Sequence, residues 1–162
     1  MNKNTNKNTN GNTNITNQDL AKLAIEARSR AYTPYSNFMV GAALLTKGGK
    51  VYQGCNIENA GYSPTVCAER TAFFKAVYEG EREFTAIAVA GWPRDAKSAS
   101  AAFPCGVCRQ VMREFCDPKS FKILVLKGNT GEYTEHTEYT EYTEHTLEEL
   151  LPYGFGPSDL GF

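Results

Sequence analysis

Apolar and polar residues follow two different spacings along this chain, which predict helices in some segments and strands in others. Apolar residues at every third or fourth position predict a first helix over residues 19–32, which Thr16 or Asn17 could cap. Two strand-like runs, 38–45 and 51–57, flank a Gly-Gly turn. Such runs on either side of a tight turn predict a β-hairpin.

The second half of the chain alternates predicted helices with predicted strands. Helical spacing covers residues 67–78 and 106–115, and continuous apolar runs typical of buried strands cover 84–90 and 121–126. A short terminal helix is predicted over 147–151. The helical connections are long enough for parallel crossovers between strands. We therefore expect a three-layer α/β/α domain with a mixed sheet of about five strands.

Three segments do not follow these spacings. Residues 1–17 are almost entirely Asn, Thr, Lys and Gly and predict a disordered tail, which leaves residues 18–162 as a single domain. Residues 132–146 repeat Thr-Glu followed by His or Tyr, and a period of three fits neither a helix nor a strand. We interpret this repeat as a mobile low-complexity loop that could carry a strand at its start. Residues 153–162 are rich in Gly and aromatic residues, and we expect them to dock on this subunit or on a neighbour.

Composition narrows the classes of function. With 162 residues, 41% of them hydrophobic, the chain suits one compact domain. A formal net charge of −1 and a sequence pI of about 6.1 argue against a nucleic-acid partner. No run approaches the ~20 apolar residues that cross a bilayer, so we expect no membrane partner. Five cysteines are an odd number and no stretch is typical of a secretory signal, so we expect a cytoplasmic protein with reduced thiols.

The candidate chemistry lies in three cysteines, Cys67, Cys105 and Cys108, at the starts of two predicted helices. Unpaired backbone N–H groups and the helix dipole favour a thiolate at such a position. Three thiolates are one fewer than a closed structural zinc site needs, and a catalytic zinc keeps its fourth position for water. Glu69 lies two residues beyond Cys67, where its carboxylate could accept a proton from that water.

Simpler interpretations of these cysteines remain open from the residues alone. A lone Cys-x-x-Cys also occurs in redox sites and zinc ribbons. Cys55 could close a four-cysteine structural site, although we interpret Cys55 and Cys116 as small buried apolar side chains. His136 and His145 both lie in the Thr-Glu repeat, which makes them poor candidates for metal ligands.

The order of the motifs points to one family. A Cys-Ala-Glu helix start, a βα unit and then Pro-Cys-x-x-Cys at the next helix start resemble the zinc-deaminase pattern. Four segments are similar to those of the small cytidine deaminases of pyrimidine salvage: YSNFMVGAAL at 35–44, GCNIENA at 54–60, CAERTA at 67–72 and PCGVCRQV at 104–111. The resemblance runs from about residue 19 to the C-terminus, without the Thr-Glu repeat.

The resemblance implies a role for each residue of the metal site. The zinc ligands would be Cys67, Cys105 and Cys108, and Glu69 would be the proton shuttle. Arg70 follows Glu69 directly, and we expect its guanidinium to donate to a thiolate sulfur and so to offset the negative charge of a three-thiolate zinc site.

The resemblance also implies a binding site for a nucleoside. Asn56 and Glu58 would hold the ribose hydroxyls, Phe38 would line the pyrimidine pocket, and the backbone of Ala68 would read the edge of the base. The family's small members are homotetramers in which a C-terminal aromatic residue reaches into a neighbour's site, and Phe155 is the candidate here. From the residues alone, Phe38 could equally be core, and Asn56 and Glu58 could lie on a solvated strand edge.

The implied activity is zinc-dependent hydrolysis of cytidine and deoxycytidine to uridine and deoxyuridine plus ammonia, in pyrimidine salvage. One alternative is a blasticidin-type deaminase of a modified cytosine nucleoside. The run Asn-Ile-Glu-Asn at residues 56–59 favours plain cytidine and deoxycytidine instead. A deaminase that edits RNA or DNA is disfavoured by the near-neutral charge. A structural zinc or interaction module is disfavoured because Glu69 is present.

Overall fold

The computed structural model describes residues 15–96, 100–127 and 140–161. Its centre is a five-stranded sheet in the order β2-β1-β3-β4-β5. The strands are β1 (Phe38–Thr46), β2 (Val51–Cys55), β3 (Phe84–Pro93), β4 (Lys122–Leu126) and β5 (Tyr142–Thr146). The helices are α1 (Asn17–Arg28), α2 (Ala68–Tyr78), α3 (Gly106–Phe115) and α4 (Leu147–Leu150), followed by a 3-10 turn over Pro157–Leu160.

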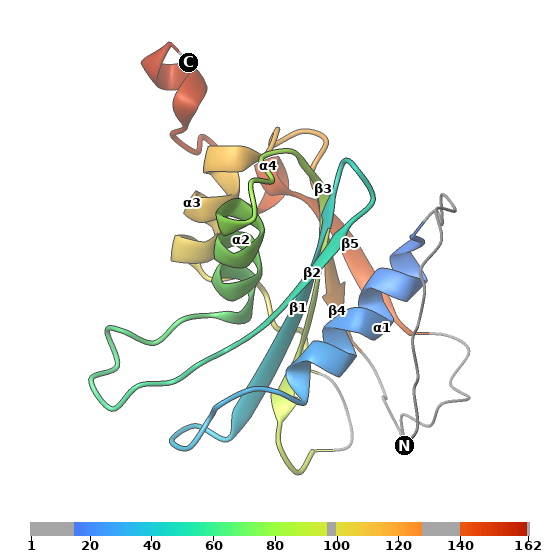
Figure 1. Ribbon diagram of the computed structural model, residues 1–162, viewed down its shortest axis with the longest axis vertical. Helices are drawn as coiled ribbons and strands as arrows, with labels where there is room; N and C mark the ends of the chain where they lie inside the picture. The colour runs from blue at the N-terminus through green and yellow to red at the C-terminus, as the bar shows by residue number, and fades with distance from the viewer. Residues whose placement is uncertain (1–14, 97–99, 128–139, 162) are drawn as a thin grey trace, which may run out of the picture.

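The helices lie on both faces of the sheet. Helix α1 covers one face, while α2 and α3 lie side by side on the other (Figure 1). Each face has its own buried apolar cluster, one under α1 and one under α2 and α3. The predicted three-layer α/β/α architecture with a mixed sheet is confirmed. None of the described helices has the length and apolarity that a membrane span requires.

Strand pairing follows the predicted connections. Strand β1 pairs antiparallel with β2, its hairpin partner, and with β3 on its other side. Strands β3 and β4 are parallel and are joined through α3. Both the predicted hairpin and the predicted parallel crossover are therefore present.

Helix α1 begins and ends earlier than predicted. Its N-cap is Thr16, which forms a reciprocal capping box with Asp19, and residues 1–14 of the predicted tail lie outside the described part of the chain. Its last residue is Arg28, and the predicted end at residue 32 is wrong. Tyr32 is extended instead, because its backbone exchanges hydrogen bonds of 3.0 and 2.9 Å with Asn56 and Glu58.

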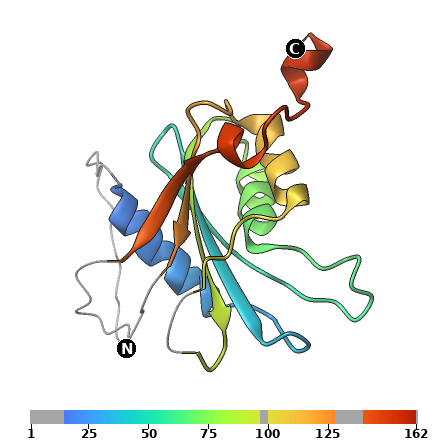
Figure 2. The ribbon, with the colours of Figure 1, turned by 180° about the vertical axis from the view of Figure 1, so that it is seen from behind.

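The end of the Thr-Glu repeat is a strand, contrary to the prediction of a loop. Strand β5 pairs antiparallel with β4 at the edge of the sheet, where Figure 2 shows it in orange-red. Strand β4 would otherwise present unpaired backbone groups, and Tyr and Thr favour extended structure. The predicted position of a strand at the start of the repeat falls on residues outside the described ranges, and the strand observed is at its end.

Close packing of α2 against β2 sets the position of the Cys67 region. A Cβ atom on Gly54 would lie 2.4 Å from the carbonyl oxygen of Ala68 and 2.5 Å from the backbone nitrogen of Ala72. Only a glycine in β2 allows the first turn of α2 to lie this close to the sheet. The start of α2 is thereby held directly over the strands.

Candidate metal centre and adjoining pocket

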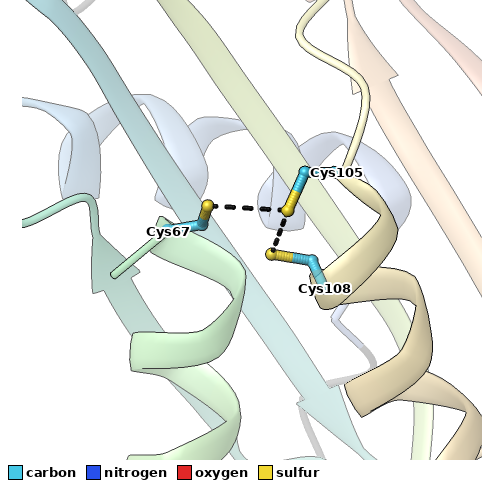
Figure 3. A group of neighbouring side chains, drawn as sticks. All are labelled: Cys67, Cys105 and Cys108. Atoms are coloured by element: carbon cyan, nitrogen blue, oxygen red, sulfur yellow. Dashed lines mark hydrogen bonds between the residues drawn. The ribbon is translucent and has the colours of Figure 1, made fainter. Parts of the chain in front are cut away.

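Three cysteine sulfurs converge where α2 and α3 begin. Cys67 is the N-cap residue of α2, Cys105 is the N-cap residue of α3, and Cys108 lies one turn into α3. Their sulfur atoms all lie within 4.8 Å of one another, with 3.8 Å between Cys67 and Cys105 and 3.4 Å between Cys105 and Cys108 (Figure 3). The predicted ligand set is therefore brought together in space.

The local backbone explains why these sulfurs meet. Both N-cap cysteines are extended, and neither side chain caps its own helix. A Ser or Asp at an N-cap normally turns back to bind the helix N–H groups, but these sulfurs point to a common centre instead. Two helix N-termini, which favour negative charge, therefore face the same point.

The thiols share protons in a way that favours ionisation of Cys67. Hydrogen bonding from Cys108, helped by Arg70 and Cys105 against the cost of burial, lowers the pKa of Cys67 to about 5. The same contact with Cys67, together with burial, raises the pKa of Cys108. One thiolate thus forms readily in this cluster, as expected at a site for a thiophilic cation.

The sulfur positions fit zinc. Ligand sulfurs at the corners of a tetrahedron and ~2.3 Å from the ion would be about 3.8 Å apart. The observed separations of 3.8 and 3.4 Å are close to that value. Among the described residues, the cluster contains no fourth His, Cys, Asp or Glu ligand. This donor set matches the three-ligand, open type of zinc site.

Cys55 and Cys116 lie outside the cluster, which excludes the four-cysteine alternative. Cys55 ends β2 and its thiol donates to the carbonyl oxygen of Arg30 at 3.3 Å. Cys116 is buried in the core next to α3. The interpretation of Cys116 as a packing residue is confirmed, whereas Cys55 is only half-buried.

Glu69 lies in the first turn of α2 and is 4% exposed. Burial raises the pKa of its carboxyl group to about 7, against a partial lowering by hydrogen bonds. A group with a pKa near neutrality can both accept and return a proton under physiological conditions. Glu69 is therefore suited to proton transfer beside the cysteine cluster.

A cavity of about 260 Å³, here called the cysteine pocket, is lined in part by Cys67, Glu69 and Cys105. The pocket is slightly smaller than the ~300–1,000 Å³ typical of sites for drug-sized ligands, which suits a small substrate. Its walls are formed by Phe38, Val40, Asn56, Thr65, Cys67, Ala68, Glu69, Val89, Ala102, Phe103 and Cys105. Of the predicted binding residues, Phe38, Asn56 and Ala68 are present. Phe103 was not predicted as a pocket residue, although it directly precedes Pro104 and Cys105 and could have been expected near the metal site for that reason.

Asn56 has a structural task in addition to facing the pocket. Its side-chain oxygen accepts from the backbone N–H of Val40 at 2.8 Å, and its amide nitrogen donates to the carbonyl of Phe38 at 2.9 Å. These bonds hold the start of β1, and with it Phe38, against the pocket. A primary amide has a second donor and a second acceptor position, so Asn56 can still bind a ligand.

Glu58 faces a neighbouring hollow of about 430 Å³ that shares Thr65 with the cysteine pocket. Its carboxylate accepts from the backbone N–H groups of Tyr35 and Ser36 at 2.9 and 3.3 Å and from the Ser36 hydroxyl. The Ser36 hydroxyl and these backbone donors lower the pKa of Glu58. The structure therefore places Glu58 beside the cysteine pocket and outside its wall.

Arg70 has the predicted contact with sulfur. Its guanidinium lies 3.7 Å from the Cys67 sulfur and donates to the carbonyl oxygen of Thr65 at 3.0 Å. The first contact places a positive charge beside a candidate ligand, and the second ties that charge to the loop before α2.

Phe155 lies outside the cysteine pocket of its own chain. It follows α4 in the C-terminal segment, which projects away from the sheet (Figure 1), and the residue is 59% exposed. The side chain of Gln110 donates to the Phe155 carbonyl at 3.0 Å. Within a single chain, Phe155 therefore contacts the outer side of α3.

Comparison with known proteins agrees with this geometry. Residues 14–124 match the family described as cytidine and deoxycytidylate deaminase zinc-binding region. The chain is 47% identical over 148 residues to a cytidine deaminase of Sporosarcina psychrophila, covering 89% of this chain and 96% of the relative. It is 48% identical over 145 residues to one of Halalkalibacterium halodurans, covering 88% and 96%. A crystal structure of cytidine deaminase from Burkholderia pseudomallei superposes with a TM-score of 0.71 at 42% identity, covering 86% of this chain and 99% of that one.

Proposed function

The chain belongs to the zinc-binding cytidine and deoxycytidylate deaminase family, and we propose that it hydrolyses cytidine and deoxycytidine to uridine and deoxyuridine with release of ammonia. One observation carries this proposal. Cys67 and Cys105 of the three-cysteine cluster line the same pocket as Glu69, a buried carboxyl group with a pKa of about 7. A hydrolytic deaminase needs both groups, because it must activate water and move protons.

In the reaction, one water oxygen replaces the amino group on the cytosine ring, and one ammonia leaves. Cys67, Cys105 and Cys108 would hold a zinc ion, which when bound would supply a Lewis acid that makes water nucleophilic at neutral pH. Glu69 accepts one proton from the attacking water and gives it to the ring nitrogen beside the reacting carbon. Glu69 then carries the second proton to the departing amino group, so both hydrogens of the water are accounted for.

The nucleoside binds with its base in the cysteine pocket. Phe38 contacts the pyrimidine ring, and the backbone of Ala68, at the start of α2, reads the edge of the base. Asn56 binds the ribose hydroxyls through the remaining donor and acceptor positions of its side-chain amide. Glu58 reaches the ribose from the neighbouring hollow, and its lowered pKa keeps it an acceptor for hydroxyl protons.

We also propose that the protein is a homotetramer with its sites at subunit contacts, where Phe155 enters the site of a neighbour. The exposure of Phe155 together with Tyr153 and Leu160 in the same C-terminal segment supports this arrangement, since several exposed apolar side chains in one segment are typical of an interaction surface. Mixing Glu69→Ala and Phe155→Ala subunits tests it, because hybrids would pair an intact Glu69 with an intact Phe155. Partial recovery of activity supports shared sites, and no recovery with proven subunit exchange contradicts them.

The substrate class indicates a role in pyrimidine salvage in the cytoplasm, where free nucleosides are available. The activity is tested by following the ultraviolet absorbance change of cytidine, with zinc content determined on the same sample. We expect conversion at one zinc per chain, and faster turnover of cytidine than of a blasticidin-type nucleoside. Zinc-loaded protein that leaves cytidine unchanged would refute the proposed activity.

A further inference from the structure

Phe103 is part of the wall of the cysteine pocket but has no role in the function proposed above. It lies two residues before Cys105, in the loop that leads into α3, and the residue is 47% exposed. The same pocket contains the ring of Phe38. Two aromatic rings in the wall of one small cavity suit a planar aromatic ligand such as a pyrimidine base.

The ring of Phe103 is supported by His145 of strand β5. The two ring centroids are 5.4 Å apart and the rings are inclined by 62°, which is an edge-to-face contact. His145 pairs with Ile123 of β4, so the backbone of the sheet holds its ring in place. The Nε2 atom of His145 is buried without a hydrogen-bond partner among the described residues. Leaving a buried nitrogen unpaired costs free energy, so a hydrogen bond of Nε2 does not explain why a histidine stands here. The contact of its ring with Phe103 explains it better.

A second contact ties the same stretch to the segment that follows β5. The guanidinium of Arg109 donates to the carbonyl oxygens of Pro104 and Leu150 at 2.7 and 2.6 Å. Leu150 is the last residue of α4, which begins directly after β5. Phe103 and Pro104 are therefore held from two sides by β5 and α4, the segment where the Thr-Glu repeat ends.

We propose that Phe103 determines substrate fit by contacting the pyrimidine base, and that His145 is a positioning residue that holds the Phe103 ring against the base. This inference rests on the proposed function and assigns its site a further wall. The end of the Thr-Glu repeat, which carries His145, would therefore help to shape the active site.

The inference predicts an effect on binding more than on chemistry. Phe103 carries no group that can transfer a proton and His145 is not part of the pocket wall, so removing either ring should weaken substrate binding and leave kcat nearly unchanged. An aromatic pair contributes enough for Phe103→Ala and His145→Ala each to raise KM by about 3- to 10-fold. The dissociation constant of uridine, which binds without reacting further, rises by the same factor.

A double-mutant cycle on the zinc-loaded protein separates positioning from general destabilisation. In the Phe103→Ala background, His145→Ala should change KM and uridine binding by less than about twofold, because the ring it supports is gone. His145→Phe keeps an aromatic edge and should restore KM to within about twofold of wild type. The matched control is Glu144→Gln, the neighbour in β5 whose carboxylate contacts Lys122 and Asn17. It should leave KM unchanged.

Each other outcome counts against the inference. Equal effects of His145→Ala with and without Phe103, or a fall in kcat with KM unchanged, overturn the positioning role. Should His145→Ala fail to fold, His145→Leu fills the same space without an aromatic edge and is expected to raise KM equally. Wild-type protein that deaminates cytidine but shows no coupling refutes only this inference, whereas wild-type protein that neither deaminates cytidine nor binds uridine refutes the proposed function as well.

Discussion

Each face of the sheet is covered by helices over a buried apolar cluster, but the two clusters differ in composition and in their relation to the candidate metal site. Under α1, the buried cluster is rich in alanine: Ala21, Ala24, Ala43, Ala86, Ala88 and Ala90. Under α2 and α3, aromatic rings pack around Phe73, with Phe84 edge to face at 5.0 Å and Phe115 stacked at 6.1 Å between ring centroids. Among the described residues, the cysteine cluster is found only on this second face (Figures 1 and 3).

The difference lies in how the helix N-termini are used. The start of α1 is closed by its own capping box between Thr16 and Asp19, so the backbone N–H groups of these two residues are bonded within the chain. The starts of α2 and α3 have cysteine N-caps that make no capping bond. A capped N-terminus adds stability, whereas an uncapped N-terminus leaves its positive end for an anionic ligand atom. The candidate metal site therefore lies on one face, and substitutions on the two faces should have separable effects.

The largest effect is expected from Cys105→Ser. It removes one thiolate from the cluster, so the protein should lose zinc and with it nearly all activity. Zinc content by atomic absorption and deamination of cytidine measure both losses. Cys116→Ser is the matched control from the other end of α3, and it should lower the melting temperature while keeping one zinc per chain. Retention of zinc by Cys105→Ser would contradict the proposed ligand set.

Glu69→Ala should abolish most activity without loss of the metal. It removes the proton carrier and no ligand, so we expect kcat to fall by about 10²–10⁴-fold or more. Steady-state kinetics and zinc analysis on one sample check this prediction. A Glu69→Ala protein without zinc would show that Glu69 holds the metal.

Arg70→Gln should lower kcat by roughly tenfold with zinc still bound. The guanidinium lies 3.7 Å from the Cys67 sulfur, where it offsets negative charge that would weaken the Lewis acid. Its loss therefore affects reactivity more than metal retention. Kinetics equal to those of the wild type would remove this role from Arg70.

The sequence predicts the helix starts better than it predicts contacts between distant segments. The helix starts at Cys67 and Cys105 could be predicted, because each cysteine directly precedes an apolar pattern with helical spacing. Strand β5 could not, since a period of three fits no regular element and only the open edge of β4 selects its conformation. The contact between Phe103 and His145 was likewise invisible, because it joins segments 42 residues apart through the sheet. The turn of the chain after Arg28 was missed for the same reason.

The raised pKa of Glu69 should make the metal-free protein sensitive to pH. Burial raises this pKa from 4.5 to about 7, so between these values the folded chain keeps a proton that the unfolded chain releases. Stability is therefore lost as pH rises through this window. After chelation, Glu69→Gln should be more stable than wild type at pH 8 by on the order of 2 kcal/mol, and the difference should close toward pH 4. Urea unfolding at both pH values measures it, and a difference independent of pH would contradict the burial effect.

The smallest effect on activity is expected from Arg28→Met on the opposite face. The guanidinium of Arg28 lies 3.8 Å above the Trp92 ring and donates to the carbonyls of Trp92 and Pro93 at 2.9 Å each. Its loss should cost about 1–2 kcal/mol of stability. At a temperature where the protein stays folded, zinc content and kcat should equal those of wild type. A large loss of zinc would show that the two faces are coupled.

Zinc K-edge X-ray absorption on the purified protein tests the central claim most directly, because it counts the atoms around the metal. We predict three sulfur neighbours at about 2.3 Å and one lighter atom from water or substrate. Four sulfur neighbours, or a protein that binds no stoichiometric zinc, would contradict the open three-cysteine site.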